Sequence, residues 1–258
     1  MVGGVTAVLE RRRVVALAVL VAALAAYFAA HVSLPGLTLW WDIAVLSLVV
    51  MPAVFATVWL LLPLWNVPWL WIAGVVCAVL ALLFSLLDWE GPASFAKLGG
   101  ATFLAWWFLE LFEAVSWVVL VAAIVPWVDA YSVFQGPTKS IVTKKPGIFD
   151  AFSFAFPLPG QHSTANLGIP DLFFFALFLG GAARFGLRRG LTWTLGTASF
   201  GATIALAVWL NIGGLHGLPA LPLLSLAFFL ANGDLLWRAL NRHRGVSGSE
   251  PQTPETPE

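Results

Sequence analysis

The sequence predicts an all-α membrane protein, a polytopic helix bundle with about eight transmembrane helices and about seven as the alternative. Of its 258 residues, 60% are hydrophobic and only 10% are charged, and the mean hydropathy is +0.91. An ordinary soluble domain has about 25% charged residues, so this chain lacks the charge to cover a soluble surface. Apolar stretches of about 20 residues, the length that crosses a bilayer core, recur along the sequence.

Charge and cysteine content exclude several function classes. The 13 Lys and Arg residues balance the 13 Asp and Glu residues, and this balance without a basic block argues against nucleic-acid binding. Cys77 is the one cysteine and lies in an apolar run, which excludes an intrachain disulfide and a multi-cysteine metal site. The histidines are scattered, so we predict no metal and no other cofactor.

The N-terminal membrane segment is predicted to contain three helices. Within residues 1–97, the predicted spans are 14–30, 43–64 and 69–87. Arg11–Arg13 precede the first span; this pattern fits either a signal peptide or a first membrane helix, and we favour an uncleaved helix. Proline within a membrane helix is tolerated where neighbours satisfy the freed carbonyl, so the prolines of the second span do not end it. Residues 88–92 are predicted to form a surface loop.

Residues 98–244 form the predicted core. Glu110 and Glu113 interrupt a long apolar run near its middle, where a single span would bury both carboxylates in hydrocarbon, so we place a turn there. The predicted helices of the core are 98–112, 115–134, 167–185, 191–211 and 218–237. Residues 135–166 form a long polar loop between two of them. Residues 245–258, with their Ser, Pro and Glu, are disordered by composition.

Positive charge predicts the orientation. With about eight spans, the arginines at 11–13, at 184–189 and at 238–244 all lie on one side, whereas about seven spans would separate them. The positive-inside rule therefore favours the larger number, with both termini cytoplasmic and the polar loop outside. The Arg-rich composition and the lack of an organelle-sorting signal lead us to expect a prokaryotic plasma membrane.

Two acidic residues stand apart from the others. Asp42, Asp88, Glu90, Glu110, Glu113 and Asp234 lie at predicted span ends or turns, where a surface position suits them. Asp129 and Asp171 are embedded in apolar sequence, and each is predicted to lie about 6–8 Å inside the same membrane face. Helices joined by one loop commonly pack as neighbours, so the two carboxylates could meet. The alternative is structural, an interfacial acid at Asp129 and a helix-start acid after Pro170.

Three segments resemble the presenilin and signal-peptide-peptidase family of intramembrane aspartyl proteases. Residues 128–139, Val-Asp-Ala-Tyr-Ser-Val-Phe-Gln-Gly-Pro-Thr-Lys, resemble the segment around that family's first catalytic aspartate. Gly168-Ile169-Pro170-Asp171 resembles its Gly-x-Gly-Asp motif, which carries the second aspartate. Pro219-Ala220-Leu221-Pro222 matches its Pro-Ala-Leu motif at the start of the last helix. The three occur in the family's order, within about residues 98–240.

The resemblance implies a function and a set of site residues. It implies an intramembrane aspartyl endopeptidase that cuts signal-peptide remnants or other membrane helices within the bilayer. The implied catalytic residues are Asp129 and Asp171, and the implied substrate-binding residues are Gly168, Pro219, Ala220 and Leu221. The predicted orientation is similar to that of signal peptide peptidases and opposite to that of presenilins.

The sequence leaves two other functions open. Val128 stands where the family usually has Tyr, and Pro170 stands where it has the second Gly; these departures favour a non-proteolytic member of the fold that binds membrane helices. Proline-interrupted spans and intramembrane acids also suit a proton-coupled transporter with Asp129 and Asp171 as its relay. In the protease, one carboxylate of the pair would activate water while its protonated partner polarises the scissile carbonyl.

Overall fold

A computed structural model describes residues 10–134, 152–210 and 218–246. These residues are mostly helical, as the sequence predicts, and they include one two-stranded antiparallel sheet. The helices are α2 (Arg11–Ala30), α3 (Leu39–Val45), α4 (Met51–Leu61), α5 (Leu70–Leu86), α6 (Glu90–Leu109), α7 (Val115–Phe134), α10 (Ile169–Arg184), α11 (Arg189–Trp209) and α12 (Leu221–Val246). The strands are β1 (Ser153–Pro157) and β2 (Thr164–Gly168).

Four helical segments in the described residues are long and apolar enough to cross a membrane. They are Arg11–Ser33, Leu39–Leu64, Val115–Val133 and Arg189–Trp209, and Leu70–Leu86 is a shorter apolar helix. This composition is compatible with an integral membrane protein.

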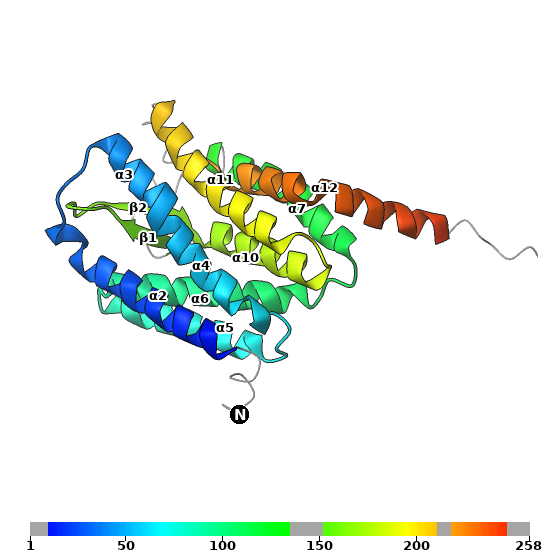
Figure 1. Cartoon of the computed structure of the whole chain (residues 1–258), viewed down its shortest axis with the longest axis horizontal. Helices are drawn as coiled ribbons and strands as arrows, with labels where there is room; N and C mark the ends of the chain where they lie inside the picture. The colour runs from blue at the N-terminus through cyan, green and yellow to red at the C-terminus, as the bar shows by residue number, and fades with distance from the viewer. Residues whose placement is uncertain (1–9, 135–151, 211–217, 247–258) are drawn as a thin grey trace, which may run out of the picture.

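Successive helices run back and forth between two ends of the bundle (Figure 1). At one end, which we call the hairpin end, Lys97 Nζ in the first half of α6 donates to Ser153 O at 3.0 Å, and Gly160 N donates to His31 O after α2 at 2.7 Å. At the other, the arginine end, Arg184 Nη1 at the end of α10 donates to Leu109 O at the end of α6, 2.6 Å away.

Prolines shape the segment from Leu39 to Leu64. A π-helical turn, Leu46–Val50, separates α3 from α4, and Pro52 follows it at the start of α4. A 3-10 turn, Leu62–Leu64, contains Pro63 and ends the segment. Because proline has no N–H group to donate, the regular helical pattern is interrupted at each of these points without ending the helical path.

The predicted boundaries of α7 agree with the structure, whereas the predicted start of α6 does not. The turn at 110–114 and the helix Val115–Phe134 lie where the sequence places them. The surface loop predicted for residues 88–92 is wrong in part, because α6 begins at Glu90. Gly91 and Pro92 occupy its first turn, where N–H groups have no intrahelical acceptor and proline is therefore accommodated.

Close contacts join α6 and α10 at the centre of the core. Trp106 Nε1 donates to Ala176 O at 3.0 Å, and a Cβ atom added at Gly180 would lie 2.6 Å from Trp106 Cδ1. The glycine is therefore required for the approach of the two helices. The rings of Phe55 and Phe200, 5.0 Å apart and stacked, join α4 to α11 in the same core.

The β-hairpin was not predicted. Its register pairs Ser153 with Gly168 and Pro157 with Thr164, and the side chains of Phe154 and Phe156 are buried. The rest of the predicted polar loop, residues 135–151, lies outside the described residues, as does most of the predicted tail, residues 247–258. The helix α12 continues to Val246, beyond its predicted end at 237.

Candidate functional site

Two helices that meet at the hairpin end carry the aspartates. Asp129 lies near the end of α7, and Asp171 lies in the first turn of α10, directly after the hairpin. Both side chains are half-buried, and their carboxyl groups are close enough to interact electrostatically. The structure therefore brings together the pair that the sequence singles out.

Asp129 is held by the start of α12. Its Oδ2 atom accepts a hydrogen bond from the backbone N–H of Leu221 at 3.1 Å. Leu221 is the first residue of α12, and the first N–H groups of a helix have no acceptor within it. A carboxylate there is favoured by this bond and by the positive end of the helix dipole. The Pro-Ala-Leu segment is thus in direct contact with the first aspartate.

Asp171 is held by the start of its own helix. Gly168 is the N-cap of α10, and its backbone N–H donates to the Asp171 carboxyl group. A side chain at the third helical position that reaches back to the N-cap is a capping interaction. A Cβ atom at Gly168 would lie 3.1 Å from Asp171 Oδ2, so glycine leaves room for the carboxyl group.

Pro170 is compatible with this local structure. It occupies one of the first two positions of α10, where a missing N–H removes no helical hydrogen bond. Val128 is 61% exposed and Tyr131 is 65% exposed, so neither side chain of α7 is packed into the core beside Asp129. Pro170 therefore fits the start of α10, and the Val128 side chain points away from the core.

Pro219 and Ala220, which the resemblance implies for substrate binding, directly precede Leu221 in the sequence. The side chain of Ala220 is 6% exposed and that of Leu221 is 4% exposed, whereas Pro219 is half-buried. The carbonyl of Ala220 accepts a hydrogen bond from Leu224 N at 3.1 Å. Of these four residues, Gly168 and Leu221 contact the aspartates through backbone N–H groups.

Asp42 was misassigned from the sequence. The predicted surface position is wrong, because its side chain is only 3% exposed. Asp42 Oδ2 accepts a hydrogen bond from Gln161 Nε2 at 2.7 Å, and Oδ1 has no partner among the described residues. The bond joins the hairpin turn to α3, and a signal for it is absent from the sequence because the two residues are 119 positions apart.

The hairpin turn has two further attachments. Tyr27 Oη donates to Pro157 O at 2.7 Å, and Gly160 N donates to His31 O at 2.7 Å. The hairpin is thus fixed at its turn by α2 and α3, while its other end continues through Gly168 into α10. This arrangement determines the position of Asp171.

The arginine end holds α12 from the opposite side. Arg188, which precedes α11, makes a two-point contact with Asp234 of α12, with both N–O distances at 2.7 Å. Asn232 Oδ1 accepts from Arg188 N at 2.9 Å, and Asn232 Nδ2 donates to Thr192 Oγ1 at 2.8 Å. Within the part of the chain that the structure describes, no three His, Cys, Asp or Glu side chains gather as they would around a metal ion.

Comparison with models of known protein families, with curated proteins and with solved structures found no match.

Proposed function

We propose that this protein is an intramembrane aspartyl endopeptidase of the presenilin and signal-peptide-peptidase type. It hydrolyses peptide bonds within membrane helices or signal-peptide remnants, with Asp129 and Asp171 as the catalytic pair. One observation carries the proposal: the Asp129 carboxylate accepts the Leu221 N–H while it interacts electrostatically with Asp171. One residue from each of the three segments that carry the resemblance thus supports this proposal.

The reaction follows from the chemistry of two neighbouring carboxyl groups. Two such groups in a medium of low dielectric constant share one proton, because ionising both is costly. The ionised carboxylate takes a proton from water, and the oxygen of that water attacks the scissile carbonyl carbon. The protonated partner donates a hydrogen bond to the carbonyl oxygen and stabilises the tetrahedral intermediate.

The hairpin supplies a place for an unwound substrate. A membrane helix hides its peptide bonds within its own hydrogen bonds, so it has to become extended before cleavage. Strand β2 pairs with β1 on one side and ends at Gly168, close to Asp171. An extended peptide that adds to the other edge of β2 would be held by main-chain hydrogen bonds beside the pair. Substrates of this enzyme are therefore helices that unwind readily near the outer membrane face.

The proposed topology has about eight membrane crossings, with both termini in the cytoplasm of a prokaryotic cell. Residues 1–97 then form an N-terminal membrane segment and residues 98–244 the presenilin-like core. The hairpin end faces outward, where water reaches the aspartates.

The test is cleavage of a labelled membrane-helix substrate by the purified full chain in liposomes. We expect the wild type to release fragments cut within the helix, and Asp129→Asn and Asp171→Asn to lose this activity. Asp234→Asn is the matched control, because Asp234 lies at the arginine end in an ion pair with Arg188, and it should cleave normally. Equal cleavage by both pair variants and the wild type would reject the proposal.

A proton-coupled transporter is the second candidate. Ser225 of α12 and Thr197 of α11 are buried, and their hydroxyl groups have no partner among the described residues. Buried hydroxyls without a hydrogen-bond partner in the described residues suit a path for protons. The same liposomes distinguish the two functions: pH-driven flux that depends on both aspartates, without cleavage, would favour the transporter.

A further inference from the structure

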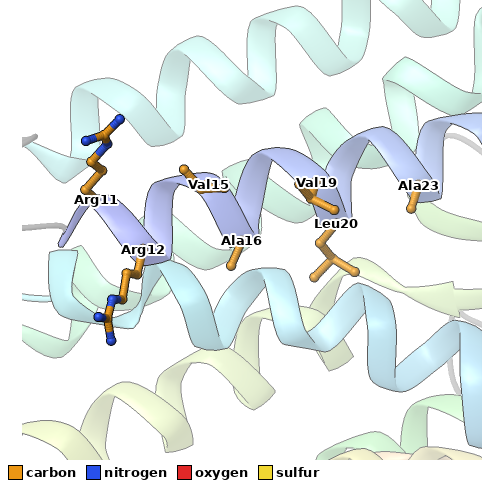
Figure 2. A pocket seen from close by; sticks show the side chains of 7 residues that line it. All are labelled: Arg11, Arg12, Val15, Ala16, Val19, Leu20 and Ala23. Atoms are coloured by element: carbon orange, nitrogen blue, oxygen red, sulfur yellow. The ribbon is translucent and has the colours of Figure 1, made fainter.

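One face of α2 carries a shallow hollow that the proposed protease does not use. The hollow has a volume of about 790 Å³ and is lined by side chains of α2. Arg11 and Arg12 line one end, and apolar side chains continue the lining as far as Ala23. Figure 2 shows the two guanidinium groups on either side of the helix, with the apolar side chains following along it.

The length of the hollow matches one leaflet of a bilayer. From Arg12 to Ala23 an α-helix rises about 16 Å, and half of a bilayer hydrocarbon core is about 15 Å. The helix α2 itself continues to Ala30. A partner transmembrane helix would contact α2 along its whole length, whereas a lipid occupies a single leaflet. The dimensions therefore favour a lipid as the occupant.

The charge at the end of the hollow indicates the class of lipid that would bind there. Arg11 and Arg12 are exposed, and the one ion pair in the described residues is that of Arg188 with Asp234. Arg184 donates to the protein carbonyl of Leu109, so two other arginines of this end already bind protein groups. A guanidinium group matches the oxygens of a phosphate in pairs.

The residues at the start of α2 carry a net positive charge. Glu10 precedes Arg11 in the sequence, and with Arg13 included the segment keeps a net positive charge. The helix ends at the hairpin end of the bundle, where His31 binds Gly160, so its first residues lie at the arginine end. An anionic group at the membrane surface would therefore meet the two guanidinium groups directly.

We propose that this face of α2 binds one anionic phospholipid of the leaflet at the arginine end. The lipid phosphate lies beside Arg11 and Arg12 at the N-terminal end of the hollow, and an acyl chain follows the apolar side chains to Ala23. Small side chains at Ala16 and Ala23 provide the depth that the chain occupies. The site is independent of the aspartate pair.

The test measures lipid binding to the purified full chain in detergent by native mass spectrometry. The probes are phosphatidylglycerol and phosphatidylcholine with identical acyl chains, and inorganic phosphate. We expect Arg11→Gln/Arg12→Gln to weaken phosphatidylglycerol binding by about 10-fold or more, because each arginine near an anionic surface contributes about one order of magnitude or slightly less. Ala16→Phe, which fills the hollow without a change in charge, should weaken it as well.

The matched control is Arg189→Gln/Arg238→Gln, which removes the same charge from exposed positions outside the hollow. We expect this variant to bind phosphatidylglycerol within about 2-fold of the wild type. Thermal stability in phosphatidylcholine checks that every variant is folded. Equal losses in the two double variants, unchanged binding by Ala16→Phe, or displacement of the lipid by inorganic phosphate would each overturn the proposal.

Discussion

Asp129 and Asp171 are each held by a backbone N–H group at the start of a helix. Leu221 N donates to Asp129 from α12, and Gly168 N donates to Asp171 from the N-cap of α10. A capping role and a chemical role are compatible here, since the bonds that cap the helices also fix the orientation of the carboxyl groups. A functional pair needs such support, because small displacements of reacting groups are costly.

Gly168 offers a direct test of this positioning. In Gly168→Ala, the new Cβ atom would lie 3.1 Å from Asp171 Oδ2, so the carboxyl group has to move by a few tenths of an ångström. The backbone at Gly168, with φ −60° and ψ 143°, is open to alanine without strain. We therefore expect cleavage to fall about 10- to 100-fold, while the free energy of unfolding changes by no more than about 1 kcal/mol. Parallel measurements of cleavage rate and thermal stability check this.

The hydrogen bond to Asp129 can be tested with a substitution that removes its donor. Leu221→Pro deletes the donor, and proline is well accommodated at the first position of a helix. Leu221→Ala is the control, because it loses the buried side chain but keeps the N–H group. We expect the proline variant to cleave about 10-fold or more slowly than the alanine variant, since a hydrogen bond to a charged group contributes about 1.5–3 kcal/mol. Equal rates in the two variants would contradict the role of this bond.

At the level of residues, the sequence predicts the pair but not its support. Two acids within apolar runs stand out because each needs an explanation. The donors at Leu221 and Gly168 are main-chain groups, which every residue type carries, so no sequence pattern marks them. Asp42 illustrates the opposite case, since its burial depends on Gln161, which is remote in the sequence.

At the level of elements, most helices follow from apolar length, and the hairpin does not. The helix α7 extends from Val115 to Phe134, as expected from the two glutamates that precede it. Phe152, Phe154 and Phe156 alternate with small residues, which is the pattern of a half-buried strand. That signal is short and follows a polar segment with lysines, so composition favoured a loop. The hairpin matters because it connects α2 and α3 to Asp171.

The hairpin turn provides the test at this level. Gln161→Ala removes the hydrogen bond that the buried Asp42 side chain accepts from the hairpin turn, which costs about 1–3 kcal/mol. We expect faster limited proteolysis at the turn and a lower thermal stability. Ser163→Ala is the control, because the hydroxyl of Ser163 donates to Gln161 Oε1 from an exposed position. If the turn is equally resistant to proteolysis in both variants, Asp42 does not hold the turn in place.

At the level of the whole molecule, the distribution of charge and the direction of the helices predict the same orientation of the protein in the membrane. The arginine end gathers Arg184 and Arg188, and the aspartates lie towards the hairpin end. The positive-inside rule then predicts that the hairpin end faces outward. Helix packing at this scale, such as Gly180 against Trp106, follows from shape complementarity between segments that the sequence alone does not pair.

Single cysteines test the predicted topology. Cys77 is the one native cysteine, so Cys77→Ser provides a cysteine-free background. In it, Ser163→Cys places a thiol in the exposed hairpin turn and Glu113→Cys places one in the exposed turn before α7. An impermeant maleimide on intact cells should label the first, and the second only after permeabilisation. Labelling of both from outside, or no labelling of Glu113→Cys in permeabilised cells, would contradict this topology.

The central claim is that the two carboxyl groups act as one catalytic unit. The most direct measurement is the rate of helix cleavage in liposomes by the wild type, Asp129→Asn, Asp171→Asn and the double variant. Residues that act as a unit are not additive, so each single variant should fall about 100-fold or more, to the same rate as the double variant. Cleavage that persists in either single variant, or losses that add up in the double variant, would contradict a catalytic pair.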